Sequence, residues 1–303
     1  MYRETAKRGK RKSHYLVENI RSGSGWKKIK VYLGSNLTER ELKNRIAEKR
    51  KILEERVKAY LKASDPLRSL ITDREAKELE SVRKKHQEYQ KKAHPFEKKQ
   101  YYEWFGVQFT YNTSAIEGAT LSLLDTKLLL EDKIVPKGKS IREINEVQNH
   151  KEAFDYMLSY KGSLTRSFVL SLHKKLMHNI LWKQAGKFRD VQVYLPGVDK
   201  KLPKPEEVPK EFKKLMLWHA HNKNRYHPVV AAAYYHAAFE SIHPFRDGNG
   251  RVGRLILNFM LRKSGFPMID IKYRDRRKYY EGLQAYDRGN LRPLAEMIIK
   301  YIK

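Results

Sequence analysis

Two kinds of hydrophobic pattern divide the chain. Residues 1–34 contain two runs rich in β-branched and aromatic residues, HYLVENI and WKKIKVYL, separated by RSGSG. Such runs on either side of a Gly/Ser turn predict a β-hairpin, which is too short to be stable alone. After residue 34 the apolar positions recur at helical spacing.

Two strongly polar helical segments follow the hairpin. We expect them over 39–63 and 73–93, in a charged helical arm that covers 35–94. The two helices would pair with each other, lie in solvent or contribute to a homodimer. Each begins with a threonine followed three residues later by a glutamate, the spacing of a capping box: Thr38 with Glu41, and Thr72 with Glu75.

From residue 95 onward the apolar density rises, and nearly every segment has helical spacing. One segment, 187–197 (KFRDVQVYLPG), alternates and then turns at Pro196-Gly197, which predicts a short β-hairpin. The fold class is therefore mainly α: a helical bundle over 95–303 with one short hairpin, preceded by the basic hairpin and the arm. Helix start signals lie at Ser122, Ser140 and Thr165, near Glu206, at Pro228, and near Asn249, Asp275 and Leu291.

Charge and composition narrow the classes of function. The 303 residues include 64 Lys and Arg against 35 Asp and Glu, a net charge of +29, which favours polyanionic partners. No cysteine is present, which excludes disulfides, thiolate metal sites and cysteine nucleophiles. The basic N-terminus lacks the apolar stretch of a signal peptide, and the most apolar segment, 229–239, is too short to span a membrane. We expect a cytoplasmic protein with no membrane partner.

The densest chemistry lies in the run from His243 to Arg254, HPFRDGNGRVGR. Pro244 disfavours helical geometry at His243, so the preceding helix should end there. Gly248-Asn249-Gly250 tolerate positive φ and can aim successive backbone N–H groups into one concavity. A helix that begins just after this turn adds its positive end, and together these features predict an anion site.

The remaining charged residues of this run indicate which anion would bind. Arg251 and Arg254 lie on neighbouring helix faces, and two guanidinium groups at one site suit a polyphosphate. Asp247 would repel phosphate unless a cation lay between them, which points to Mg²⁺. His243 has an ordinary pKa near ~6.5 and can accept a proton at neutral pH. This set of groups suits phosphoryl or nucleotidyl transfer to a hydroxyl.

The run resembles the signature of the Fic family, His-x-Phe-x-Asp/Glu-Gly-Asn-Gly-Arg-x-x-Arg, at every specified position. The resemblance extends from about Pro95 to the C-terminus and implies an all-helical fold with a hairpin flap. It also implies transfer of AMP from ATP to a protein Ser, Thr or Tyr hydroxyl, with Phe245 anchoring the loop. The implied roles are His243 as the base, Asp247 as the Mg²⁺ ligand, Gly248, Asn249 and Gly250 as the phosphate cradle, Arg251 at the β-phosphate and Arg254 at the γ-phosphate.

Two further segments fit the same family. The stretch that begins at Gly186-Lys187-Phe188-Arg189 looks like the flap, which holds a target segment by strand addition. Tyr279 and Tyr280 are placed at the adenine pocket by their position alone. The flap residues that would line the target are Val191, Gln192, Val193 and Tyr194.

A second motif, Thr113-Ser114-Ala115-Ile116-Glu117-Gly118, resembles the inhibitory helix of the family. The resemblance implies that Glu117 pairs with Arg254, removes the partner of the γ-phosphate and orients ATP unproductively. A free-energy difference of only ~2.7 kcal/mol would lower turnover about 100-fold. The sequence therefore predicts a self-inhibited enzyme whose target protein is unknown.

Three alternatives stay open at this point. The same site could run in reverse and hydrolyse AMP from a modified protein, with Glu117 positioning a water. The donor could be UTP or GTP. A non-enzymatic regulator is the third alternative: Arg and Lys interleaved with Tyr15, Trp26 and Tyr32 suggest nucleic-acid contact through residues 1–34, with the Fic domain sensing a nucleotide.

Overall fold

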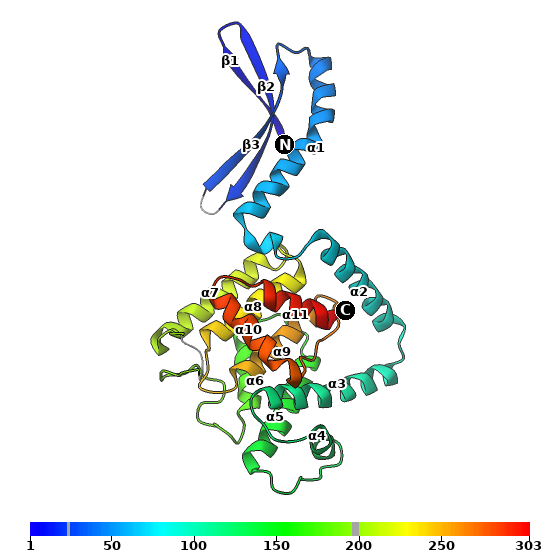
Figure 1. Cartoon of the computed structure of the whole chain (residues 1–303), viewed down its shortest axis with the longest axis vertical. Coiled ribbons are helices and arrows are strands. Elements are labelled where there is room, and N and C mark those ends of the chain that lie inside the picture. Colours follow the sequence, from blue (N-terminus) through cyan, green and yellow to red (C-terminus); the bar gives the residue numbers. More distant parts are fainter. Residues whose placement is uncertain (23–24, 196–199) are drawn as a thin grey trace. The chain divides into compact units, whose positions relative to one another are not determined.

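The structure, a computed structural model, describes residues 1–22, 25–195 and 200–303 and divides into two compact units, Met1–Ser69 and Leu70–Lys303. The first unit is an antiparallel sheet in the order β1-β2-β3 with helix α1 packed on one face (Figure 1). Its elements are β1 (Tyr2–Arg8), β2 (Arg11–Ser22), β3 (Gly25–Ser35), α1 (Glu39–Ser64) and a short 3₁₀ turn (Pro66–Ser69).

The first unit differs from the predicted hairpin and arm in two ways. A third strand, β1, pairs along β2, although its sequence YRETAKR has no apolar alternation to predict a strand. Helix α1 belongs with the sheet rather than with a separate arm, because its apolar stripe covers apolar side chains that a bare hairpin would expose. The buried core consists of Leu16, Val31 and Leu33 from the sheet and Leu42 and Leu53 from α1.

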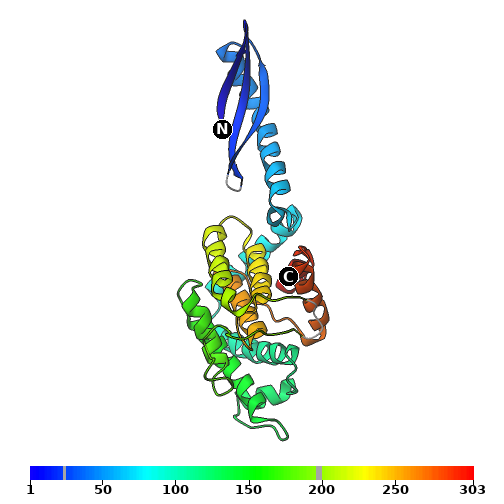
Figure 2. The same cartoon turned by 90° about the vertical axis from the view of Figure 1, so that its left-hand side faces the viewer.

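The second unit is a helical bundle built around α8 (Pro228–Ile242) and α9 (Asn249–Lys263). Twelve of the fifteen residues of α9 are buried, so this helix forms the centre of the unit. Figure 1 and the side view of Figure 2 show the other helices around this pair. They are α2 (Asp73–Lys92), α3 (Pro95–Ile116), α4 (Leu123–Leu130), α5 (Ile141–Ser159), α6 (Arg166–Leu176), α7 (Val208–Asn222), α10 (Arg276–Asp287) and α11 (Arg292–Ile302).

The predicted helix starts and the mainly α class are confirmed. Thr72 and Glu75 form a complete capping box at the start of α2. Arg292 then joins this helix to α11, donating to both carboxylate oxygens of Glu75 at 2.7 and 3.0 Å. The hydrogen bonds from Arg292 lower the pKa of Glu75 to about 2. Helix α2 is thus part of the second unit, so the two helices of the predicted arm belong to different units.

The predicted flap hairpin is wrong for the residues that can be compared. No strand occurs over 187–195, and the predicted turn at 196–197 lies outside the described residues. The segment is fixed by Arg189 instead, whose side chain donates to the carbonyl oxygens of His243 and Val191 at 2.8 and 3.2 Å. The alternating apolar and polar residues of this segment are compatible with a strand. A strand also needs a second strand to pair with, and the described part of the chain supplies none here.

None of the helices in the described ranges combines the length and the apolar character needed to cross a bilayer.

Candidate active site

The loop between α8 and α9 has the backbone geometry that its sequence predicts. Helix α8 ends at Ile242, and His243 adopts a left-handed conformation with φ 50°, just before Pro244. Gly248 has φ 79° and precedes the first turn of α9. This conformation favours glycine, and a Cβ at Gly248 would also lie 2.7 Å from Met177 Cε, which would have to shift.

Side chains hold this loop in place from within. Asn249 bonds the backbone of Phe245 twice: its Oδ1 accepts from the N–H at 2.8 Å and its Nδ2 donates to the carbonyl at 2.9 Å. The Asn249 side chain is therefore committed to the loop, and a phosphate could meet only its backbone N–H. Phe245 is fully buried and stacks on His173, with ring centroids 3.7 Å apart. The predicted anchoring role of Phe245 agrees with this burial.

His173 supports the loop, and no motif in the sequence indicates this role. Its Nε2 lies 3.1 Å from the carbonyl oxygen of Asp247, and its Nδ1 accepts from the N–H of Gly186. These contacts leave the imidazole neutral, and burial lowers the pKa of His173 to about 4. A scattered histidine with no motif around it gives no sequence signal, since its partners come from two distant loops.

His243 presents a neutral imidazole to a cavity of about 520 Å³. Burial lowers the pKa of His243 to about 4, so the ring is unprotonated at neutral pH and free to accept a proton. Arg189 positions this residue from behind, because its Nε donates to the carbonyl of His243 and its backbone N–H donates to Pro244. The same cavity is lined by five other predicted residues: Glu117, Gly250, Arg254, Tyr279 and Tyr280.

Arg254 lies at the wall of this cavity and is almost completely buried, with 1% of its surface exposed. Its Nη2 donates to Glu117 Oε1 at 2.6 Å, as the inhibitory motif predicts. Its Nε donates to Thr113 Oγ1 at 2.6 Å, and its Nη1 lies 3.4 Å from the hydroxyl of Tyr279. Burial lowers the pKa of Arg254, but the neighbouring Glu117, Tyr279 and Glu240 together outweigh it and hold the pKa above its ordinary value.

Glu117 reaches Arg254 across the first turn of α9. It caps the end of α3, and a Cβ on Gly250 would lie only 2.2 Å from its Oε1. Any side chain at Gly250 would therefore exclude the carboxylate as well as crowd a phosphate. Glu117 keeps 34% of its side chain exposed, so one face of the carboxylate is open to the cavity.

A second acidic side chain of this site, Glu240, was not predicted. It lines the cavity, and burial raises its pKa to about 8. A Cβ on Gly253 would lie 2.1 Å from its Oε1, so the glycine makes room for it. Glu240 lies one helical turn before His243 along α8, and that spacing is the only sequence signal that could have pointed to it.

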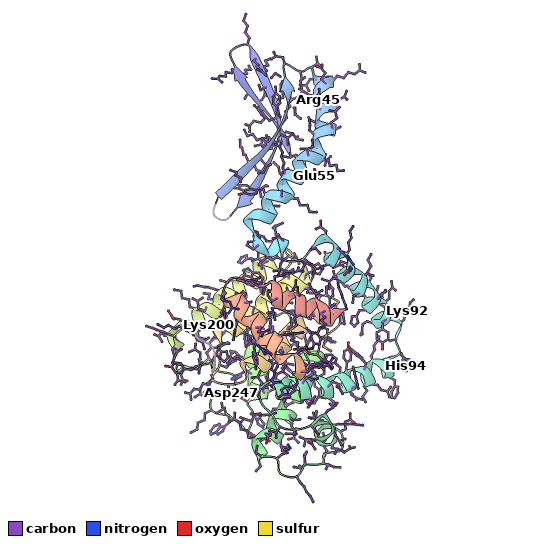
Figure 3. All side chains as sticks on the ribbon, viewed as in Figure 1. Arg45, Glu55, Lys92, His94, Lys200 and Asp247 are labelled. Carbon is purple, nitrogen blue, oxygen red and sulfur yellow. The ribbon has the colours of Figure 1, made fainter. Side chains whose placement is uncertain are left out.

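Asp247 and Arg251 lie outside the cavity lining, in a closed ring of alternating charges. Asp247 accepts from Arg251 at 3.1 Å and from Arg142 of α5 at 2.8 Å. Glu146 completes the ring, 3.0 Å from Arg142 and 3.7 Å from Arg251. Asp247 is labelled in Figure 3. The sequence predicted a cation at Asp247, and the cations observed there are two guanidinium groups.

The two tyrosines have different environments. Tyr279 is fully buried and bonds His236 Nε2 at 2.9 Å, so it backs Arg254 as well as lining the cavity. Tyr280 is partly exposed, and its hydroxyl donates to the carbonyl of Ile116 at 3.1 Å. Tyr280 therefore joins α10 to the end of the helix that carries Glu117. Both tyrosines line the cavity, and their assignment to an adenine pocket stays a prediction.

The flap residues are exposed next to this site. Val191, Gln192 and Tyr194 are open to solvent, with Tyr194 85% exposed, and Val193 is half-buried. Asp190 bonds Arg246 of the loop at 2.8 Å and so holds the start of the segment beside the loop. Leu195 lines the cavity. The segment thus exposes most of its side chains beside the cavity that His243 lines.

The described ranges contain no group of three or more His, Cys, Asp or Glu side chains arranged to hold a metal. A single carboxylate is nevertheless the protein contribution that Mg²⁺ often takes when a substrate supplies phosphate oxygens. Asp247 could be such a carboxylate, but it could bind a metal only if its ion pair with Arg142 were broken. Arg142 is 59% exposed, which makes that exchange possible at small cost.

The chain is similar in sequence and in fold to known proteins. Residues 163–261 match the Fic/DOC family. The chain is 34% identical over 198 residues to "Protein adenylyltransferase Fic" of Nematostella vectensis, an alignment that covers 64% of this chain and 46% of that protein. A segment of Fic-1 from C. elegans aligns with a TM-score of 0.67 and 30% identity, over 80% of this chain and 72% of that one. A Fic domain protein from Bacteroides thetaiotaomicron aligns with a TM-score of 0.68 and 26% identity, over 75% of this chain and 92% of that one.

The chain spans less than half the length of the curated relatives that it matches.

Proposed function

Because the chain belongs to the Fic/DOC family, we propose that it is a protein adenylyltransferase, which moves AMP from ATP to a Ser, Thr or Tyr hydroxyl of a protein. The observation that carries this proposal is the cavity shared by a neutral imidazole, His243, and a buried guanidinium, Arg254. A base and a phosphate partner that face one cavity are what hydroxyl attack on a nucleotide requires.

His243 would act as the general base. Its low pKa keeps the ring neutral at physiological pH, so it can take the proton of an incoming hydroxyl. The oxygen would then attack the α-phosphate, the bond to the β-phosphate would break, and pyrophosphate would leave. The N–H groups at the start of α9, including those of Asn249 and Gly250, would stabilise the charge that develops on the phosphate oxygens.

We propose that Glu117 inhibits this reaction by occupying Arg254. The carboxylate at 2.6 Å takes the position in which Arg254 would bind the γ-phosphate. Thr113 holds the guanidinium from the other side, so Arg254 cannot turn toward a different anion without losing a buried hydrogen bond. Carboxylate and phosphate would thus compete for one buried cation.

We assign the metal role to Asp247, because its carboxylate lies beside the phosphate-binding turn and its counter-charge Arg142 is exposed. Mg²⁺ bound there with ATP would neutralise charge on the α- and β-phosphates. Arg251 would contact the β-phosphate from the same ring. In the absence of nucleotide, Arg142 and Arg251 hold the Asp247 carboxylate in place of the metal.

The target would bind along the flap. Val191, Gln192 and Tyr194 are exposed, and a target segment could pair with the backbone of this segment, which would bring the target hydroxyl toward His243. The cytoplasmic location, a homodimer and UTP or GTP as donor stay predictions of the sequence.

The first test is the origin of the transferred label. The Glu117→Gly protein incubated with α-labelled ATP and Mg²⁺ should become labelled, either on itself or on a target in a lysate. With γ-labelled ATP it should stay unlabelled, because the γ-phosphate leaves with pyrophosphate. The Glu117→Gly/His243→Ala protein is the matched control and should show no label from either donor.

Label from γ-labelled ATP would identify phosphoryl transfer and contradict the proposal. Equal α-label in the His243→Ala control would remove the base from the mechanism. The reverse reaction has its own outcome: with an adenylylated target, loss of AMP release on replacement of Glu117 would indicate that this carboxylate positions a hydrolytic water.

A further inference from the structure

The first unit carries positive charge out of proportion to its size. Residues 1–69 contain 20 Lys and Arg against 8 Asp and Glu, a net charge of +12 in less than a quarter of the chain. None of the groups assigned to adenylyl transfer lies in this unit. Its function is therefore a separate question from that of the site at His243.

The pairing register shows which side chains share the face of the sheet that α1 leaves open. Leu16 pairs with Val31, and both point into the core beneath α1. Their neighbours therefore point to the other face, since side chains alternate along a strand. By register, the side chains of that open face include Tyr2, Glu4, Tyr15, Val17, Asn19, Trp26, Lys28, Lys30 and Tyr32.

Four of these nine side chains are aromatic, and three of them are well exposed. Trp26 is 73% exposed, and Tyr2 and Tyr32 are 40% and 45% exposed. Along β3 the order is Trp26, Lys28, Lys30, Tyr32, so two lysines separate two aromatic rings over about 20 Å of strand. Tyr15 lies beside Tyr32, with ring centroids 5.5 Å apart.

We propose that this open face binds single-stranded nucleic acid. Exposed rings on a sheet offer flat platforms on which unpaired bases stack, and interleaved lysines meet the phosphates. A membrane surface fits less well, because the exposed residues in this set are aromatic or polar and its one large aliphatic residue, Val17, is fully buried. Paired bases present edges rather than faces, so a duplex would leave the rings without partners.

One residue of the face makes the proposal sharply testable. Glu4 lies between the two lysines and accepts a hydrogen bond from each, from Lys28 at 2.8 Å and also from Lys30. The hydrogen bonds keep both ammonium groups close to a carboxylate. A phosphate would have to compete with Glu4 for them.

The experiment is fluorescence anisotropy of the full chain with a labelled single-stranded oligonucleotide, as DNA and as RNA, and with the matching duplex. The single strand should bind more tightly than the duplex, and DNA and RNA should bind alike, because stacking does not read the sugar. Trp26→Ala and Tyr32→Ala should each weaken binding by about 5-fold or more. Tyr32→Phe, which keeps the ring, should bind like the wild type.

Trp182→Ala is the matched control, since Trp182 is an equally exposed tryptophan of the second unit. Glu4→Gln should tighten binding, and it should steepen the salt dependence by up to about 1.4 in log–log slope as two lysines become available. Thermal unfolding of each variant excludes a loss of fold.

Tighter binding to the duplex, or equal binding by the Trp26→Ala and Trp182→Ala proteins, would overturn the proposal. Binding to anionic vesicles with the same dependence on Trp26 would also do so. Adenylyl transfer by the Glu117→Gly enzyme should not change in the Trp26 and Tyr32 variants, so this test and that of the active site can fail independently.

Discussion

Two charge clusters flank the loop that carries His243, and they differ in burial more than in composition. On one side, Arg254 is enclosed by Glu117, Thr113 and Tyr279. On the other, Arg142 and Arg251 alternate with Glu146 and Asp247 in a ring that reaches solvent. The first cluster holds Arg254, which a phosphate would need. The second holds Asp247, whose carboxylate a metal would need.

Burial decides which cluster can restrain the enzyme. A charge taken out of water has no solvent to replace a lost partner, so a carboxylate that pairs with Arg254 is hard to displace. The ring at Asp247 is partly solvated, and pairs of that kind contribute about 1 kcal/mol or less. We therefore expect the first cluster to control turnover and the second to adjust metal affinity.

The largest effect should come from Glu117. Glu117→Gly should raise adenylyl transfer about 100-fold, because ~2.7 kcal/mol of competition for Arg254 disappears. Glu117→Gln keeps the shape without the charge and should give a smaller gain. Transfer rates with α-labelled ATP measure both. Glu103→Gln, at an exposed acid of the same helix, is the control and should leave the rate unchanged. A gain no larger than that of the control would contradict the role of burial.

Thr113 should come next. Thr113→Val removes the acceptor of Arg254 Nε while keeping the shape, so the guanidinium loses its alignment. In the Glu117→Gly background, kcat/KM should fall about 10-fold, in line with the cost of one unsatisfied buried donor. Thr113→Ser should restore the rate, since it returns the hydroxyl. A failure of serine to rescue would show that the methyl group, and not the hydrogen bond, is needed.

The third prediction is that the free energy of unfolding falls in acid, because two buried histidines hold the loop. His173 and His243 have pKa values of about 4 in the folded protein, because burial disfavours the charged ring, against about 6.5 in an unfolded chain. Their contribution to stability is complete above about pH 6.5 and is lost as pH falls toward 4, because only the unfolded chain binds protons there. Each should lower the free energy of unfolding by up to about 1.4 kcal/mol per pH unit. Thermal unfolding that is unchanged from pH 7 to pH 5 would refute this.

The smallest effect should come from Arg142. Arg142→Gln removes a cation from Asp247, so Mn²⁺ should bind the protein with a non-hydrolysable ATP analogue up to about 5-fold more tightly. Electron paramagnetic resonance of free Mn²⁺ measures this without turnover. Arg277→Gln, at an exposed arginine in an (i, i+4) pair, is the control. Weaker Mn²⁺ binding would mean that Arg142 supports the site instead of competing for it.

The sequence predicts best what is local. His243, Gly248 and the start of α9 follow from proline and glycine within a few residues, and the pairing of Glu117 with Arg254 follows from two motifs of one family. The ring at Asp247 could not be predicted, because Arg142 comes from a helix 105 positions away and has no motif of its own. His173 was missed for the same reason, whereas Glu240 lies one helical turn before His243 and only that spacing could have indicated it.

The strands show a second limit. The sequence of β1 is polar and forms a strand only because β2 offers a ladder to pair with. The flap has the alternating sequence of a strand but no partner over 187–195, and it forms none. An alternating sequence indicates which side chains would share a face of a strand. Whether the strand forms depends on a neighbouring strand that can pair with it.

The most direct test of the central claim is calorimetric binding of ATP and ADP to the wild type and to Glu117→Gln. If Glu117 competes with the γ-phosphate for Arg254, the substitution should tighten ATP binding and leave ADP binding unchanged, because ADP has no γ-phosphate. An equal gain for both nucleotides, or no gain for ATP, would contradict the claim.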